Sequence, residues 1–167
     1  AYGRALLGVG DTAAAEQAFR REIAVNANDF EANLMLGSLR RSAQDFDNAL
    51  IYLTRALEIH PRDLTARKLV ASLKLQTGAV DEAGDAFEET LERARALHLV
   101  PIVVRSLAGQ GLVARARHRI DEARAMFEAS IELFEEQRSV LPGDEIRGAF
   151  LGNHLLQEGL QGRVEIP

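Results

Sequence analysis

The sequence contains no cysteine and no tryptophan, and aromatic residues make up only 5% of its 167 residues. Without cysteine there can be no disulfide bond, thiolate nucleophile or cysteine-ligated metal. With so few aromatic residues, the core must be built mostly from Leu, Ala, Ile and Val, which favours helix packing against helix over a β-sandwich. Only four prolines interrupt the chain, so long helices can run between them.

The net charge argues against a nucleic-acid-binding protein, and the lack of long apolar runs argues against a membrane-spanning one. A nucleic-acid binder usually carries a strongly basic face, whereas the formal net charge here is −5. No apolar run approaches the roughly 18 residues of a membrane-spanning helix. The chain begins at Ala1 without Met, partway through a helical pattern, and we read it as a piece of a longer protein. Its compartment stays open, with the cytoplasm favoured because no targeting segment is visible.

An internal repeat is the main signal in the sequence. When the chain is shifted along itself, Ala15 falls on Ala49 and, after a second equal shift, on Ala83. Each of these alanines is followed four residues later by a large apolar residue. The pattern recurs at Ala123, which lies further from Ala83 than Ala83 does from Ala49, so the last unit is longer. The offsets i, i+4 and i+7 share one helix face, which predicts closely packed helices.

Before each of these helices lies another helical stretch, and short polar turns separate the two. A helix–turn–helix of about 34 residues with these offsets resembles the tetratricopeptide repeat. The segment 30–63 matches that pattern best, through Leu36-Gly37, Ala49, Leu53 and Pro61, although it lacks the family's Trp and Tyr. The resemblance implies an all-α fold, a right-handed α-solenoid of antiparallel helix pairs with about four repeats and a C-terminal capping helix.

The predicted organisation is one solenoid over residues 1–167. Its parts are a partial first repeat at 1–29, repeats at 30–63 and 64–97, a lengthened repeat at 98–140, and a capping helix with its tail at 141–167. Helices are predicted near 1–8, 12–26, 30–43, 46–60, 64–77, 80–97, 101–117, 120–138 and 144–160.

Local chemistry predicts where several of these helices begin and end. Asp11, Asp45 and Asp81 precede the second helices of their units, where a carboxylate can cap free backbone N–H groups. Pro61 follows the helix before it and prevents its continuation.

The C-terminal segment carries a second, shorter resemblance. A long helix followed by a Leu-Pro break and Glu-x-Arg-x-x-Phe-Leu resembles the end of repeat arrays that precede bacterial caspase-like (CHAT) peptidase domains. The residues concerned are Leu141, Pro142, Glu145, Arg147, Phe150 and Leu151. This resemblance implies a catalytic domain further along the gene, because this chain has no cysteine nucleophile. The alternative is a terminal helix that covers the last apolar face of the solenoid.

A search for catalytic, metal and phosphate chemistry yields no convincing candidate. Gly8-Val9-Gly10 is a lone Gly-x-Gly at a helical turn, and no serine lies in a nucleophile elbow. The basic cluster at 115–119 has no interleaved aromatic residue for base stacking and is followed by acidic residues. None of the four histidines has another histidine three or four residues away, as a metal pair on a helix would require. We therefore expect neither enzymatic activity nor a cofactor or metal.

The family resemblance implies a partner-binding groove lined by the first helices of successive units. Its positions, carried onto this sequence, are Arg4, Glu31, Leu34, Ser38, Arg41, Lys68, Ser72, Arg105 and Arg115. Most of them are basic although the protein is acidic overall. The lysine and paired asparagines of the chaperone-tail carboxylate clamp are absent, since Leu34 and Ser38 stand at those places.

The sequence therefore predicts a scaffold that binds a protein or peptide on its concave face, and the basic positions there favour an acidic partner. Arginine forks favour carboxylates, but the same arginines could merely solvate the inner surface. Two other readings stay open: a regulatory or substrate-presenting region of a larger enzyme, and a scaffold that self-associates through its repeats.

Overall fold

The computed structural model describes residues 2–140, and this part of the chain is entirely helical and turn structure. The predicted capping helix near 144–160 and the residues that resemble CHAT-associated arrays lie outside the described residues. The helices are α1 (Tyr2–Gly8), α2 (Thr12–Val25), α3 (Phe30–Ser42), α4 (Phe46–Ile59), α5 (Leu64–Gln76), α6 (Val80–Ala96), α7 (Val100–Ala116) and α8 (Ile120–Val140).

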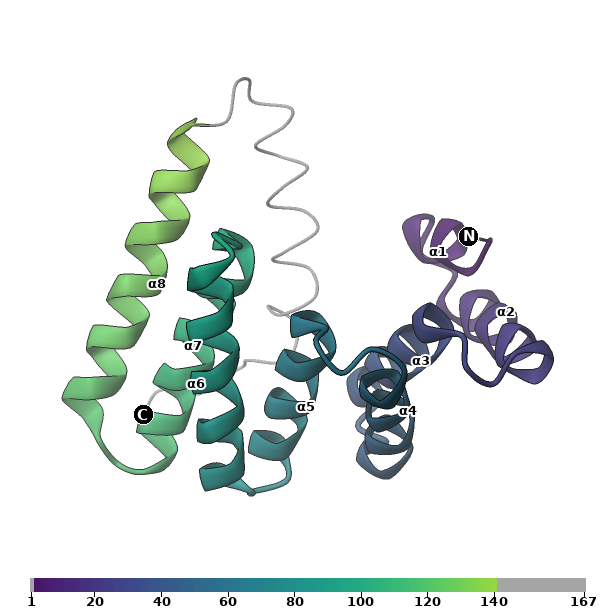
Figure 1. The fold of residues 1–167 in the computed structure, drawn as a ribbon, viewed down its shortest axis with the longest axis horizontal. Helices are drawn as coiled ribbons and strands as arrows, with labels where there is room; N and C mark the ends of the chain where they lie inside the picture. Colours follow the sequence, from purple (N-terminus) through teal and green to yellow (C-terminus); the bar gives the residue numbers. More distant parts are fainter. Residues whose placement is uncertain (1, 141–167) are drawn as a thin grey trace.

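The helices pair into four successive hairpins, α1–α2, α3–α4, α5–α6 and α7–α8, and each hairpin packs on the next (Figure 1). Contacts run mainly between neighbours in sequence, as expected for a solenoid of repeats. In Figure 1 the last four helices lie side by side as one stack, while the first hairpins are turned away from it. The predicted all-α solenoid is confirmed.

The core of each hairpin rests on one recurring contact between a very small and a large residue. A Cβ on Gly3 would lie 2.6 Å from the Phe19 ring, and a Cβ on Gly37 would lie 2.6 Å from Leu53. The last hairpin repeats this arrangement with Gly111 and Phe127. The missing Cβ lets the second helix approach the first closely, so the large side chain fills the space between them.

In the third hairpin an alanine takes the place of the glycine. Ala71 and Phe87 share a core cluster with Ala83 and Val113, and both Ala71 and Phe87 are almost completely buried. The Phe87 ring also lies against Gly109 of the next hairpin, where a Cβ would come within 2.4 Å. One aromatic ring therefore joins the third hairpin to the fourth.

The turns inside the hairpins share one backbone geometry. Gly10, Gln44, Gly78 and His118 all have positive φ, between 59° and 86°. In the second hairpin the Gln44 N–H donates to the Arg41 carbonyl and the Asp45 N–H donates to the Arg40 carbonyl, which is the Schellman pattern of helix ends. Glycine adopts this left-handed conformation without strain, whereas a glutamine or histidine does so at a cost.

An aspartate is the N-cap residue of each of the helices α2, α3, α4 and α5. The side chains of Asp11, Asp29, Asp45 and Asp63 accept hydrogen bonds from backbone N–H groups three residues later. The predicted cap at Asp81 is wrong, because α6 begins at Val80 and its N-cap residue is Ala79. The Asp81 carboxylate lies inside the first helical turn and accepts from the Arg117 guanidinium at 2.7 Å.

The helices are longer toward the C-terminal end of the described residues. Helices α2 to α5 have 13 or 14 residues, whereas α6 and α7 have 17 each and α8 has 21. The turn between α6 and α7 also changes, because His98 adopts a positive φ of 54° there. At the two earlier junctions between hairpins, Asp29 and Asp63 occupy the N-cap instead.

Replacement of Gly37 by alanine tests the close contact between helices. The new Cβ would lie 2.6 Å from the Leu53 side chain and 3.1 Å from its backbone nitrogen, so α3 and α4 must separate. We expect Gly37→Ala to lower the free energy of unfolding by about 1–3 kcal/mol, as measured by urea denaturation. Gly8→Ala is the matched control, since no neighbouring atom lies within 4 Å of its Cβ. Equal effects of the two substitutions would contradict this packing.

Exchange of turn residues tests the cost of the left-handed backbone. Gln44 has φ 59° and Gly78, at the equivalent turn of the next hairpin, has φ 86°. Gln44→Gly should raise the free energy of unfolding by about 1 kcal/mol, and Gly78→Gln should lower it by a similar amount. Thermal melting followed by circular dichroism measures both. Destabilisation by Gln44→Gly would show that the turn is not strained.

Candidate partner-binding surface

The first helices of the hairpins lie on one side of the solenoid. Helix α5 contacts both α3 and α7, whereas the second helices α2, α4, α6 and α8 make at most marginal contacts with one another. Because the chain curves toward the side where neighbouring helices meet, α1, α3, α5 and α7 form its inner side. We call the exposed side of these helices the inner face and that of the second helices the outer face.

Charge divides between these two sets of helices. Helix α1 carries one basic residue, α3 two basic and one acidic, α5 three basic and α7 two basic, which makes eight basic and one acidic. Helices α2 and α4 each carry two acidic residues, and α6 and α8 each carry six, against seven basic residues in all four. The first helices are thus strongly basic in a protein of net charge −5.

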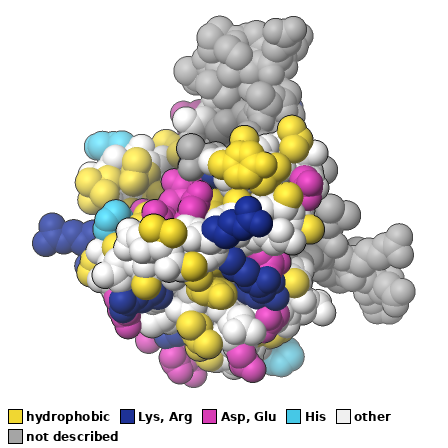
Figure 2. Space-filling model, turned by 90° about the vertical axis from the view of Figure 1, so that its right-hand side faces the viewer, with side chains coloured by type: hydrophobic (Ala, Val, Ile, Leu, Met, Phe, Trp, Pro, Cys, Tyr) yellow, Lys and Arg dark blue, Asp and Glu magenta, His cyan; other side chains and the backbone are white. Residues whose placement is uncertain are grey.

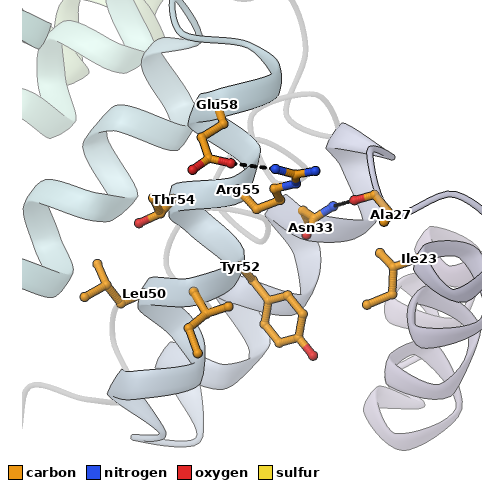
Figure 3. Close-up of a pocket in the computed structure, with 9 residues that line it drawn as sticks. Ile23, Ala27, Asn33, Leu50, Tyr52, Thr54, Arg55 and Glu58 are labelled. Carbon is orange, nitrogen blue, oxygen red and sulfur yellow. Dashed lines mark hydrogen bonds and ion pairs between the residues drawn. The ribbon is translucent and has the colours of Figure 1, made fainter.

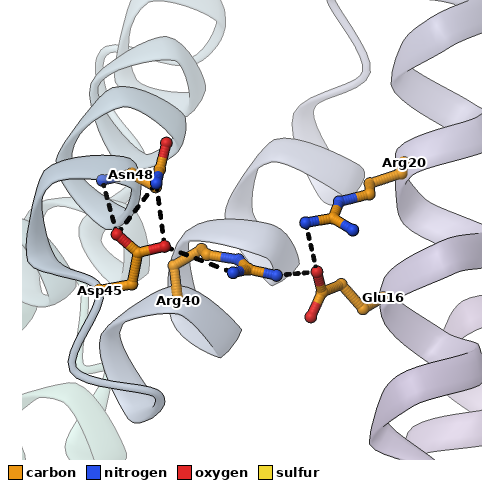
Figure 4. Close-up of polar contacts among 5 residues, drawn as sticks. All are labelled: Glu16, Arg20, Arg40, Asp45 and Asn48. Atoms are coloured by element: carbon orange, nitrogen blue, oxygen red, sulfur yellow. Dashed lines mark hydrogen bonds and ion pairs between the residues drawn. The ribbon is translucent and has the colours of Figure 1, made fainter.

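Basic residues on first helices form ion pairs with carboxylates on second helices or turns, among them Arg67, Lys74 and Arg40. Arg67 lies 2.6 Å from Glu89, and Lys74 lies 2.8 Å from Glu82. Arg40 contacts Glu16 of α2 and lies 3.3 Å from Asp45 (Figure 4). These ion pairs connect helices, and the other five basic residues of the first helices are the ones predicted for the groove.

The predicted groove residues are distributed over all four first helices. Arg4 lies on α1 and forms an ion pair of 3.2 Å with Glu31 on α3, so the structure brings these two together. Ser38 and Arg41 on α3, Ser72 on α5 and Arg105 on α7 are half-buried, and Arg115 at the end of α7 is exposed.

Two of the predicted groove residues are buried. Leu34 is 7% exposed and packs in a core cluster with Ala49, Leu53 and Leu69. Its side chain therefore fills the contact between the second and third hairpins and is not available to a ligand. Lys68 is 6% exposed although it is charged. The accessible part of the predicted groove therefore consists mainly of its arginines and serines.

Basic side chains also gather on the N-terminal end of the molecule. Figure 2 shows Lys and Arg side chains near the centre of the face seen from the right-hand side of Figure 1. Hydrophobic, acidic and histidine side chains lie among and around them, so this face is mixed.

Arg40 and Asp45 belong to a polar network that links the first hairpin to the second (Figure 4). The Glu16 carboxylate accepts from Arg20, at 2.6 Å, and from Arg40. The Asp45 carboxylate accepts from the Asn48 side chain with both oxygens at 2.9 Å and from Arg40. The hydrogen bonds from Asn48, opposed by desolvation and assisted by Arg40, lower the pKa of Asp45 below its usual value.

Replacement of Asp45 by asparagine tests this assignment through the pH dependence of stability. A carboxyl whose pKa is lower in the folded state stabilises the fold above its unfolded pKa of about 3.9, and this stabilisation is lost as the pH falls through the folded value. The stability difference between the wild type and Asp45→Asn should therefore be constant near neutral pH and shrink below about pH 4. Urea denaturation at a series of pH values measures it, and a difference independent of pH would contradict the assignment.

The outer face has one feature that the sequence interpretation missed. A depression of about 550 Å³ lies beside α4, lined by Ile23 of α2 and by Leu50, Ile51, Tyr52 and Arg55 of α4 (Figure 3). Leu50 and Ile51 are largely exposed. The signal was present in the sequence, because these positions break the polar pattern of the other second helices.

Within residues 2–140 we find no group of three or more potential metal ligands. No helix in the same part of the chain is both long and apolar enough to cross a membrane.

Two family models for the tetratricopeptide repeat match the sequence, one over residues 1–63 and the other over residues 62–136. Together they extend over all four hairpins. The chain belongs to the tetratricopeptide-repeat family. Repeats of this family build protein–protein interaction scaffolds, and this tetratricopeptide-repeat chain is such a scaffold, with proteins as its partners.

Solved structures of MamA have a similar fold. "Crystal structure of MamA" aligns with a TM-score of 0.66 and 21% identity, over 82% of this chain and 77% of that chain. "MamA AMB-1" aligns with a TM-score of 0.63 and 22% identity, over 80% and 76%. "MamA RS-1 ArsTM double mutant" aligns with a TM-score of 0.65 and 14% identity, over 96% and 92%. At these identities the likeness shows only the tetratricopeptide-repeat fold. A comparison of the sequence with curated proteins gives no match.

Proposed function

We propose that the inner face binds an extended segment of a partner protein that is rich in carboxylates. The observation that carries this proposal is the charge of the first helices, which have eight basic residues and one acidic residue. Five of the eight occupy predicted groove positions: Arg4, Arg41, Arg105 and Arg115, which are at least partly exposed, and Lys68, which is buried. The single acidic residue, Glu31, already forms an ion pair with Arg4.

The chemistry of arginine supports an acidic ligand. A guanidinium donates two parallel hydrogen bonds to one carboxylate, and such charge-assisted bonds are stronger than those between neutral groups. Ser38 and Ser72 on α3 and α5 are half-buried and add hydroxyls that can donate or accept. An extended peptide exposes its backbone groups as well, so hydroxyls between arginines suit it better than an apolar groove would.

The acidic outer helices strengthen the same preference. Helices α6 and α8 each carry six acidic and two basic residues. An acidic segment is repelled from this outer side and attracted to the inner one, which orients its approach. The rival interpretation, that the inner arginines only solvate the surface, predicts no preference between acidic and neutral ligands.

An array of extended peptides tests the proposal. Each Asp- and Glu-containing peptide is paired with a version that has Asn and Gln instead, and binding to the full chain is measured at low and high salt. We expect the acidic member of each pair to bind at least about tenfold more tightly at low salt, with the difference reduced as salt screens the charges. Equal binding of acidic and amide peptides would refute an acidic ligand.

Charge reversal locates the binding surface. Arg115→Glu should weaken binding of the acidic peptides by about tenfold, because Arg115 is exposed at the end of an inner helix. The matched control is Arg124→Glu, which reverses an exposed arginine on α8. If Arg124→Glu weakens binding and Arg115→Glu does not, the inner face is not the site.

A further inference from the structure

The outer surface of α4 is apolar at positions where the other second helices are polar or small. Leu50 and Ile51 occupy two of these positions in the second hairpin, and Thr54, with a methyl group and a hydroxyl, occupies the third. The second helices can be aligned on the repeated alanines Ala15, Ala49, Ala83 and Ala123. The equivalent residues in the other three hairpins are mostly charged or polar: Glu16, Gln17 and Arg20 in the first, Gly84, Asp85 and Glu88 in the third, and Arg124, Ala125 and Glu128 in the fourth. An exposed apolar stripe found in one unit only is not required by the repeat fold.

These apolar side chains are accessible in the folded chain. Leu50 is 44% exposed and Ile51 is 63% exposed. Both line the depression of about 550 Å³, which has room for side chains from another molecule. Figure 3 shows Leu50 on one side of α4 and Tyr52 on the other, directed toward Ile23 of α2. Exposed clusters of this kind mark interaction surfaces more often than isolated hydrophobic residues do.

Opposite charges lie one helical turn on either side of the apolar stripe. Asp47 lies four residues before Ile51 and Arg55 lies four residues after it, so all three share one helix face. Both charged residues are exposed. The Arg55 guanidinium donates to Glu58 at 2.7 Å and also to Asn28, whereas Asp47 has no ion-pair partner within the described part of the chain.

This pattern is complementary to itself. If a second α4 lies antiparallel on the first, with a two-fold axis at Ile51, each Asp47 faces an Arg55 and the two Ile51 side chains meet. We propose that two copies of this chain associate through the outer surface of α4, as a two-fold symmetric dimer with paired Asp47–Arg55 contacts. The same patch serves both copies, as an isologous interface requires.

The size of the contact sets the expected strength. A pair of 14-residue helices buries less surface than the roughly 1,600 Å² of a standard stable interface. The dimer is therefore weak, it forms as the protein concentration rises, and its Asp47–Arg55 contacts weaken at high salt. The inner face stays open in such a dimer, so acidic ligands and the second copy do not compete.

Sedimentation velocity over a range from micromolar to near-millimolar protein measures the association of the full chain. We expect a monomer–dimer equilibrium, and Ile51→Glu should raise its dissociation constant by at least about tenfold. Ile131→Glu is the matched control, because Ile131 on α8 is 61% exposed but lies on another surface. Circular dichroism confirms folding of each variant. A monomer at all concentrations, or equal effects of the two substitutions, would overturn the proposal.

A charge exchange tests the antiparallel arrangement itself. Asp47→Arg and Arg55→Asp each place like charges opposite one another, so each alone should weaken the dimer several-fold. The double variant carries Arg at 47 and Asp at 55, which restores opposite charges across the two-fold axis and should return the dissociation constant to near the wild-type value. Failure of the double variant to recover would overturn this arrangement. Binding of acidic peptides to the inner face should be unchanged in all three variants, which separates this outcome from that of the proposed function.

Discussion

The solenoid depends on the approach of two helices at a residue without a side chain, or with only a methyl group. In each hairpin the small residue lies on the first helix and the large residue that packs against it lies on the second. The two are always separated by the same number of residues, as in Gly37 and Leu53 or Gly111 and Phe127. A larger residue would separate the helices and open a gap that nothing in this core, poor in aromatic residues, could fill. The same contact is repeated in all four hairpins although the later helices are longer, and successive hairpins stack on one another.

This packing also assigns the charged residues to their surfaces. Once the small residue of the first helix faces the second helix, the other side of the first helix turns to the inner face. Arg41 and Arg115 are the residues proposed for the inner face, whereas Arg40 and Arg67 turn toward carboxylates on second helices and turns. Core packing and charge separation are therefore two consequences of the same helical spacing, and the basic inner face follows from the first helices alone.

Much of the architecture could be predicted from the sequence, because the repeat spacing depends on local contacts. Helices expected near 12–26 and 46–60 are observed at Thr12–Val25 and Phe46–Ile59. The role of Gly3 and Gly111 was missed, although each precedes a phenylalanine by the interval that separates Gly37 from Leu53. Asp81 was expected to cap α6, but the helix begins one residue earlier and an arginine distant in sequence holds its carboxylate.

The surface was harder to predict than the core. Leu34 satisfies the spacing of a groove position, but the neighbouring hairpin covers it, and only the packed structure reveals this. The apolar residues Leu50 and Ile51 could be noticed in the sequence, but the depression that they line beside α4 is also lined by Ile23 of α2 and appears only in the folded chain. The central claim is that the inner face is the ligand surface. Backbone amide chemical shifts recorded during titration with an acidic peptide test it most directly. The account predicts shift changes concentrated in α3, α5 and α7, and changes concentrated in α6 and α8 would contradict it.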